Sequence, residues 1–198
     1  MVKKVIVSLL VMVVLGVSTN RAFALGLNYG FGVGTNISSI KSLDEDISIG
    51  SGWGYQIGAH AGIDLAFMGV TAELWYSGIN ASYDAVLAGS NSGTLKVKSI
   101  DVPILASVSI FGPLKIKAGP SFSLWSNATL PNGMKFNNVR STYGYVAGIG
   151  LDFMSISIDL RYNGQFSSTI LPLGVDNPSI SDPSIRANSC SIIMSYSF

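Results

Sequence analysis

The chain has 198 residues, a length that fits one domain better than two. Only 12% of its residues are charged and 48% are hydrophobic, whereas soluble domains average about 25% charged residues, which argues against an ordinary water-facing surface. The formal net charge of +1, with no basic patch, gives no indication of nucleic-acid binding.

The first 24 residues have the pattern of a cleavable signal peptide. Lys3 and Lys4 form a positive start, residues 5–17 are almost all apolar, and Ala22-Phe23-Ala24 places small residues at the two positions that a signal peptidase reads. The alternative is an uncleaved membrane anchor, but the apolar run is shorter than the roughly 20 residues that a helix needs to span a bilayer. We therefore predict export, with cleavage after Ala24.

Residues 25–198 are predicted to form a single domain of net charge −2, because cleavage removes three of the twelve basic residues and none of the eleven acidic ones. No further long apolar helix is predicted. The single cysteine, Cys190, allows no disulfide framework, and we expect it to pack on an apolar face. If this domain stays in a membrane, it does so as a closed β-barrel, because only helices and closed barrels satisfy their backbone groups in lipid.

Apolar residues alternate with small or polar residues through nearly all of this domain, a pattern that indicates half-buried β-strands. From Leu27 to Gly34, for example, large apolar residues alternate with Asn and Gly. We predict eight strands, near residues 27–34, 53–63, 70–77, 100–110, 114–124, 143–153, 156–163 and 191–198.

The connections between these strands are alternately long and short. The long ones are rich in Ser, Asn, Asp, Gly and Pro, which favour loops. They lie at residues 39–51, 78–93, 127–140 and 167–184, and the short ones near 64–69, 111–113 and 153–155. Outer-membrane barrels have short periplasmic turns and longer extracellular loops. The predicted fold is therefore all-β: an eight-stranded antiparallel up-and-down transmembrane β-barrel in the outer membrane, with both termini in the periplasm.

The two faces of each predicted strand agree with this architecture. One face is apolar, as lipid requires, and the other carries Gly, Ser and a few charges, as a narrow lumen requires. A soluble sandwich or a lipocalin-like barrel would need a charged outer face instead. Aromatic residues also collect toward the strand ends, as in the two interfacial girdles of membrane barrels. These are Trp53, Tyr55, Tyr76, Tyr143 and Tyr162 toward the loops, and Phe111, Phe153, Tyr196 and Phe198 toward the turns.

Three segments resemble a known family. The closing run, residues 191–198, with Tyr196 and the terminal Phe198, looks like the C-terminal signal that the barrel-assembly machinery recognises. Residues 101–105 and 115–121 resemble the small outer-membrane β-barrels, or PorT-like porins, of Bacteroidota, and the architecture is similar to that of OmpA and OmpX. The resemblance implies a location in the outer membrane far more than it implies an activity.

Charged residues on the lumen-facing side of the strands are the first candidate site. They are Glu73, Asp101, Lys115, Lys117, Asp159 and Arg161. An eight-stranded barrel leaves an interior barely wide enough for side chains, and buried unpaired charge is costly, so we predict a structural network of ion pairs. The alternative is that these residues line a selective pore. Trp75 and Trp125 share the same predicted face and would further block a channel.

Three cations, Lys96, Lys98 and Arg186, fall on the outward face beyond the apolar band. They are predicted either to contact the phosphates of lipopolysaccharide or to be solvated rim residues. The acidic run Asp44-Glu45-Asp46 lacks the spaced ligands of a Ca²⁺ loop, so we interpret it as solvated charge and predict no metal site.

The only histidine, His60, lies on the predicted lumen face. It could act as a general base in a lipid-modifying enzyme, but a place in a polar packing network is favoured because it points inward near a turn. We therefore predict a non-enzymatic surface, structural or interaction protein without a cofactor, which acts through its loops on an unidentified partner. The alternatives are a narrow channel for small solutes, a lipid A-modifying enzyme and a secretion accessory protein.

Overall fold

The computed structural model describes residues 26–42, 47–65, 67–85, 91–129, 135–137, 143–166, 169–170 and 184–198. The predicted signal peptide, residues 1–24, and the acidic run Asp44-Glu45-Asp46 lie outside these ranges. Within them, no helix is long and apolar enough to cross a membrane.

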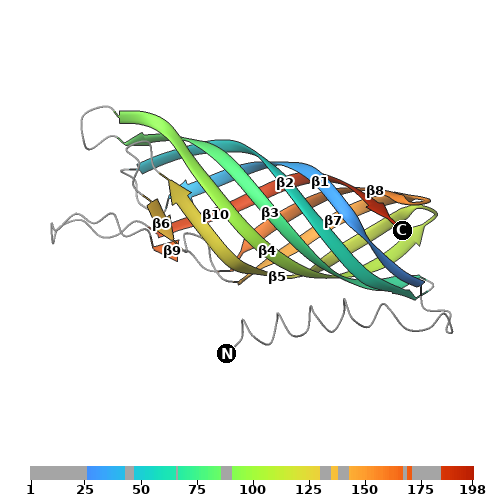
Figure 1. Cartoon of the computed structure of the whole chain (residues 1–198). Helices are drawn as coiled ribbons and strands as arrows, with labels where there is room; N and C mark the ends of the chain where they lie inside the picture. Colours follow the sequence, from blue (N-terminus) through green and yellow to red (C-terminus); the bar gives the residue numbers. More distant parts are fainter. Residues whose placement is uncertain are drawn as a thin grey trace.

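Eight long antiparallel strands form a closed barrel (Figure 1). Each strand pairs with the next along the chain, and β1 pairs with both β2 and β10, which closes the cylinder. The predicted fold class is confirmed. The strands are β1 (Gly26–Ser42), β2 (Ile47–Leu65), β3 (Met68–Ala85), β4 (Asn91–Phe111), β5 (Leu114–Thr129), β7 (Tyr143–Phe153), β8 (Ile156–Gln165) and β10 (Ser184–Ser197). Two short strands, β6 (Lys135–Asn137) and β9 (Thr169–Ile170), pair with β5 and β10.

The predicted short turns all lie at one end of the barrel, which we call the turn end; the opposite end is the loop end (Figure 1). Residues 66–67, 112–113 and 154–155 join the strand pairs there. The chain also ends at the turn end, where the amide of Phe198 donates a hydrogen bond of 2.9 Å to the carbonyl of Tyr29 near the start of β1.

The strands extend further toward the loop end than predicted. Residues 39–51 and 78–93 were expected to be loops, but β1 and β2 pair as far as Ser39 and Ser51, and β3 and β4 pair throughout this region up to Ala85 and Asn91. Toward the loop end of β3 and β4 the alternation inverts: Ile79, Ala81, Leu95 and Val97 face the lumen and are buried, whereas Asn80, Lys96 and Lys98 are exposed on the outer face. No apolar outer face therefore marks these segments as membrane strands. The ladder nevertheless continues, because its backbone hydrogen bonds do not depend on apolar side chains.

Between the loop end and the turn end, the middle of the barrel is apolar outside and mostly polar inside. Large side chains such as those of Ile57 and Leu160 are more than half exposed on the outer face, at 55% and 51%. By contrast, Glu73, Asp159 and Ser191 are nearly inaccessible in the lumen, at 4%, 1% and 1%. This is the reverse of a soluble protein and is the arrangement that a lipid bilayer accommodates.

The strand β5 changes face midway. The register of β4 and β5 shifts between Ile100 and Asp101, which pair with Trp125 and Ser123, so that Leu124 forms a β-bulge. A bulge adds one residue and reverses the alternation beyond it. The prediction that Trp125 faces the lumen is therefore wrong: its side chain lies on the outer face and is 38% exposed.

Candidate functional site in the lumen

A pair of opposite charges spans the lumen. Arg161 in β8 donates one hydrogen bond of 2.9 Å from Nη2 to Oε1 of Glu73 in β3, and a second from Nη1 to Oε2. Four steps from strand to strand separate β3 and β8 in either direction around the barrel, so this fork joins opposite walls. Both side chains are buried, and bidentate Arg–carboxylate pairs are among the stronger polar contacts in proteins.

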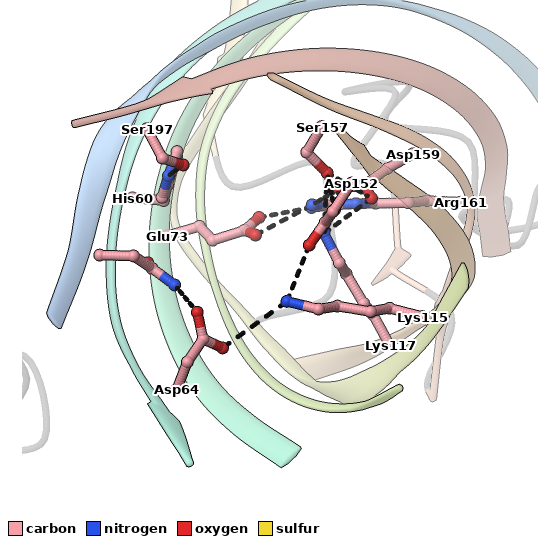
Figure 2. A network of polar contacts seen from close by, with 11 residues as sticks. His60, Asp64, Glu73, Lys115, Lys117, Asp152, Ser157, Asp159, Arg161 and Ser197 are labelled. Atoms are coloured by element: carbon pink, nitrogen blue, oxygen red, sulfur yellow. Dashed lines mark hydrogen bonds and ion pairs between the residues drawn. The ribbon is translucent and has the colours of Figure 1, made fainter. Parts of the chain in front are cut away.

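Further charges extend this pair toward the turn end (Figure 2). Arg161 also bonds Asp159, whose other carboxylate oxygen lies 2.7 Å from Nζ of Lys117. Lys115 Nζ lies 2.7 Å from Asp152. The charges therefore alternate in sign through space. Each of these buried or half-buried groups has more than one polar partner.

Smaller contacts complete the network at its edges. Lys115 also lies 3.8 Å from Asp64, which accepts a hydrogen bond of 2.5 Å from Asn28. Ser157 donates to Asp152 at 2.6 Å and accepts from Lys117 at 3.3 Å. These contacts fix the outermost carboxylates near the mouth of the turn end.

Trp75 packs beside Arg161 and Glu73, and the three side chains form a layer across the lumen. Its indole Nε1–H donates to Glu73 at 2.6 Å, and the Arg161 guanidinium lies 5.9 Å from the centre of its ring. The ring has room because it lies against two glycines, Gly58 in the adjacent strand β2 and Gly32 in β1: a Cβ at Gly32 or Gly58 would come within 2.8 or 2.5 Å of it. The prediction that Trp75 fills the lumen is confirmed.

Two small cavities lie on either side of this layer, and Arg161 borders both. The one toward the turn end has a volume of about 50 Å³, and the one toward the loop end about 40 Å³. Asp101 borders the second cavity, where it accepts hydrogen bonds from Ser99 at 2.8 Å and Ser123 at 2.6 Å.

The structure places all six predicted lumen charges inside the barrel. Five of them belong to the network around Arg161, whereas Asp101 lies by the second cavity. Asp64, Asp152 and Ser157 were not among the predicted site residues, although they share the lumen-facing alternation. Asp64 was assigned to a turn, and nothing in the sequence shows that it lies close to Lys115.

His60 lies in the wall of the first cavity, and its Nε2 is 3.0 Å from Oγ of Ser197 in the last strand. This contact links β2 to β10 across β1, as expected for a histidine in a polar packing network. In the described part of the chain, no group of three or more His, Cys, Asp or Glu side chains could hold a metal ion.

The predicted outer-face residues occupy separate regions. Lys96 and Lys98 are exposed on the outer face of β4. Arg186 is in β10, which is separated from β4 by β1, β2 and β3. The side chain of Arg186 is not among those that the structure describes. Tyr196 and Phe198 are exposed at the turn end with their rings 5.2 Å apart. Cys190 is exposed on the same outer face, as expected.

Comparison with known proteins agrees with this architecture. The family model described as "Outer membrane protein beta-barrel domain" matches residues 18–170. No curated protein matches the sequence.

Two solved structures illustrate the shared fold. Ail, the attachment invasion locus protein of Yersinia pestis, solved in complex with the heparin analogue sucrose octasulfate, is 13% identical with a TM-score of 0.51; the match covers 87% of this chain and 99% of that one. Neisserial surface protein A is 16% identical with a TM-score of 0.51 and the same coverage of both chains. At these identities the likeness concerns the fold alone.

Proposed function

Because the chain belongs to the outer-membrane β-barrel domain family, we propose that it is a plugged barrel that displays its loop end at the cell surface and acts there without enzymatic activity. The single observation that carries this proposal is the Arg161–Glu73 pair, which joins opposite walls of the lumen. A conducting pore would need an open path at this point.

The size of the cavities supports the proposal. One water occupies roughly 10–15 Å³ of such a volume, so cavities of about 50 and 40 Å³ have room for only a few waters each. A solute would have to displace Arg161, Glu73 and Trp75 together. Displacing one partner of a buried ion pair leaves the other charge without compensation, at a cost of roughly 3–5 kcal/mol.

Conductance in planar lipid bilayers tests the plug. We expect the purified wild-type barrel to show no reproducible openings. The variant Glu73→Ser with Arg161→Ser removes the bridge and is expected to connect the two cavities and produce small openings. Lys96→Gln, on the outer face, is the matched control and should stay silent. Reproducible wild-type openings that change with Lys117→Glu would favour the alternative, a narrow channel.

The surface role belongs to the proposal as well. By their names, one of the two compared structures is an attachment invasion locus protein and the other is a surface protein; both resemble this chain in fold only. The proposal places both termini in the periplasm, treats residues 1–24 as a signal peptide, and assigns Tyr196 and Phe198 to recognition by the barrel-assembly machinery. The narrower likeness to PorT-like barrels rests on residues 101–105 and 115–121 and adds no separate function. A partner can be sought by identifying what co-purifies with the protein from outer membranes.

A further inference from the structure

Two lysines stand together on the outer face of β4 near the loop end. Lys98 pairs with Gly78 of β3 on one side and Asn127 of β5 on the other. Lys96, two residues further toward the loop end, pairs with Asn80 of β3 and Thr129 of β5. Lys96 therefore has a polar paired residue on each adjacent strand and Lys98 has one, Asn127, and both lysines are exposed.

The β-bulge at Leu124 creates half of this surface. Without the extra residue, the alternation of β5 would direct Ser126 and Ala128 outward. With it, these two residues are buried at 2% exposure each, and Asn127 and Thr129 lie on the outer face beside the lysines. Bulges commonly redirect side chains in this way.

The position of the lysines relative to the aromatic residues sets their depth in a membrane. Trp125 and Tyr76 pair with Ile100, two residues from Lys98 toward the turn end. The ring of Tyr55 lies 6.5 Å from that of Tyr76. Such rings mark the boundary between lipid tails and headgroups, and two residues of a strand span about 7 Å. The lysines therefore lie at the depth of the headgroups.

The charged side chains that the structure describes on the outer face around the lysines are all positive. The outward side chains that the structure describes on β3, β4 and β5 include no carboxylate. The acidic residues of these strands whose side chains are described, Glu73 and Asp101, face the lumen. A partner for this surface is thus an anion held at the membrane boundary.

We propose that a phosphate group of lipopolysaccharide binds to this surface. We call the surface the phosphate patch and define it by Lys96, Lys98, Asn80, Asn127 and Thr129. Ammonium groups bind phosphate as point charges, and the amides can donate to the remaining phosphate oxygens. Lipopolysaccharide fits the depth of the patch because its phosphates lie next to its acyl chains. The inference rests on the proposed orientation, in which the loop end faces the lipopolysaccharide leaflet.

Binding of lipid A by the full barrel in detergent, followed by native mass spectrometry, tests the patch without reference to conductance. We expect lipid A carrying both phosphates to bind more tightly than dephosphorylated lipid A. One lysine at a membrane surface contributes about 1 kcal/mol, or about fivefold in affinity, so Lys98→Gln should weaken binding about fivefold and Lys96→Gln with Lys98→Gln roughly 25-fold. Phosphatidylglycerol should compete poorly.

Arg186→Gln is the matched control, because it removes one cation from β10 on another part of the barrel wall. Binding by this variant should stay at the wild-type level. Equal losses for Arg186→Gln and Lys98→Gln would overturn the patch in favour of a general effect of net charge. Equal affinity for phosphatidylglycerol would overturn the assignment to lipopolysaccharide and indicate a site for any anionic lipid. These outcomes are independent of whether the lumen conducts.

Discussion

Arg161 contacts two buried carboxylates: it is the cation that neutralises Glu73, and it shares Asp159 with Lys117. It bonds Glu73 and Asp159, and all three side chains are at most 5% exposed. Such networks are costly to desolvate, so the complete set adds little stability compared with an apolar core. The loss of one member is a different case, because the remaining charge stays in the lumen with no compensation.

Arg161→Met is therefore expected to lower the free energy of unfolding by about 3 kcal/mol. Glu73→Gln added to Arg161→Met should restore at least about 1 kcal/mol, since the amide carries no charge and can still accept from Trp75. Urea unfolding in detergent micelles, followed by tryptophan fluorescence, measures both differences. If the double variant were less stable than Arg161→Met alone, the charge of Glu73 would not be the source of the loss.

Two of the tight turns have the same backbone requirement but different residues. Gly112, after β4, has a φ of +53°, and Met154, after β7, has a φ of +55°. Both are the first of the two residues that join paired strand ends, where a positive φ favours glycine. Met154 is also fully exposed, so packing does not compensate for its conformation.

Met154→Gly is expected to stabilise the barrel by about 0.5–1 kcal/mol. The left-handed region costs an L-residue roughly 1–2 kcal/mol, and the greater freedom of glycine in the unfolded chain offsets part of the gain. The reciprocal variant, Gly112→Ala, should destabilise by about 1 kcal/mol, because a Cβ there meets nothing within 4 Å and only the backbone term remains. The same urea titration measures both changes. The two variants should change the free energy of unfolding in opposite directions. A loss of stability in Met154→Gly would show that the Met154 side chain stabilises the barrel by more than its backbone conformation costs.

The period-two pattern predicted the strands and the faces of most residues, because lipid outside and a narrow lumen inside select different side chains at alternate positions. It failed where that selection ends or is shifted. Beyond Ser77 of β3 the apolar side chains, such as Ile79 and Ala81, face the lumen instead of the lipid, and the Gly, Asn and Ser residues between them resemble loop sequence. The bulge at Leu124 changes hydrogen bonding without changing composition, so the position of Trp125 could not be predicted.

At the scale of the whole molecule, closure of the barrel determines which charges meet. The sequence placed Glu73, Lys117, Asp159 and Arg161 on one face but did not show that β3 and β8 lie on opposite walls at matching depth. That match depends on the strand stagger of the closed barrel. Asp64 and Asp152 join the network for the same reason, and no local motif indicates it.

An even number of strands places both chain ends on the same side of a membrane, and the short turns accompany them at the turn end. In the proposed orientation this side is the periplasm, since the exported chain enters the membrane from there. The loop-end segments of β3 and β4 then face the exterior. Thr94, exposed at the loop end of β4, and Met154, exposed at the tip of a turn, therefore lie on opposite sides of the outer membrane.

Cysteine labelling on intact cells tests this arrangement. Cys190→Ser first removes the single native thiol, and Thr94→Cys or Met154→Cys is then introduced separately. A membrane-impermeant maleimide should label Thr94→Cys on intact cells and Met154→Cys only after the outer membrane is permeabilised, because the reagent does not cross the bilayer. Cys190→Ser alone is the background control. Labelling of Met154→Cys but not Thr94→Cys on intact cells would reverse the orientation. The phosphate patch would then face the inner leaflet, where phospholipid rather than lipopolysaccharide supplies the phosphates.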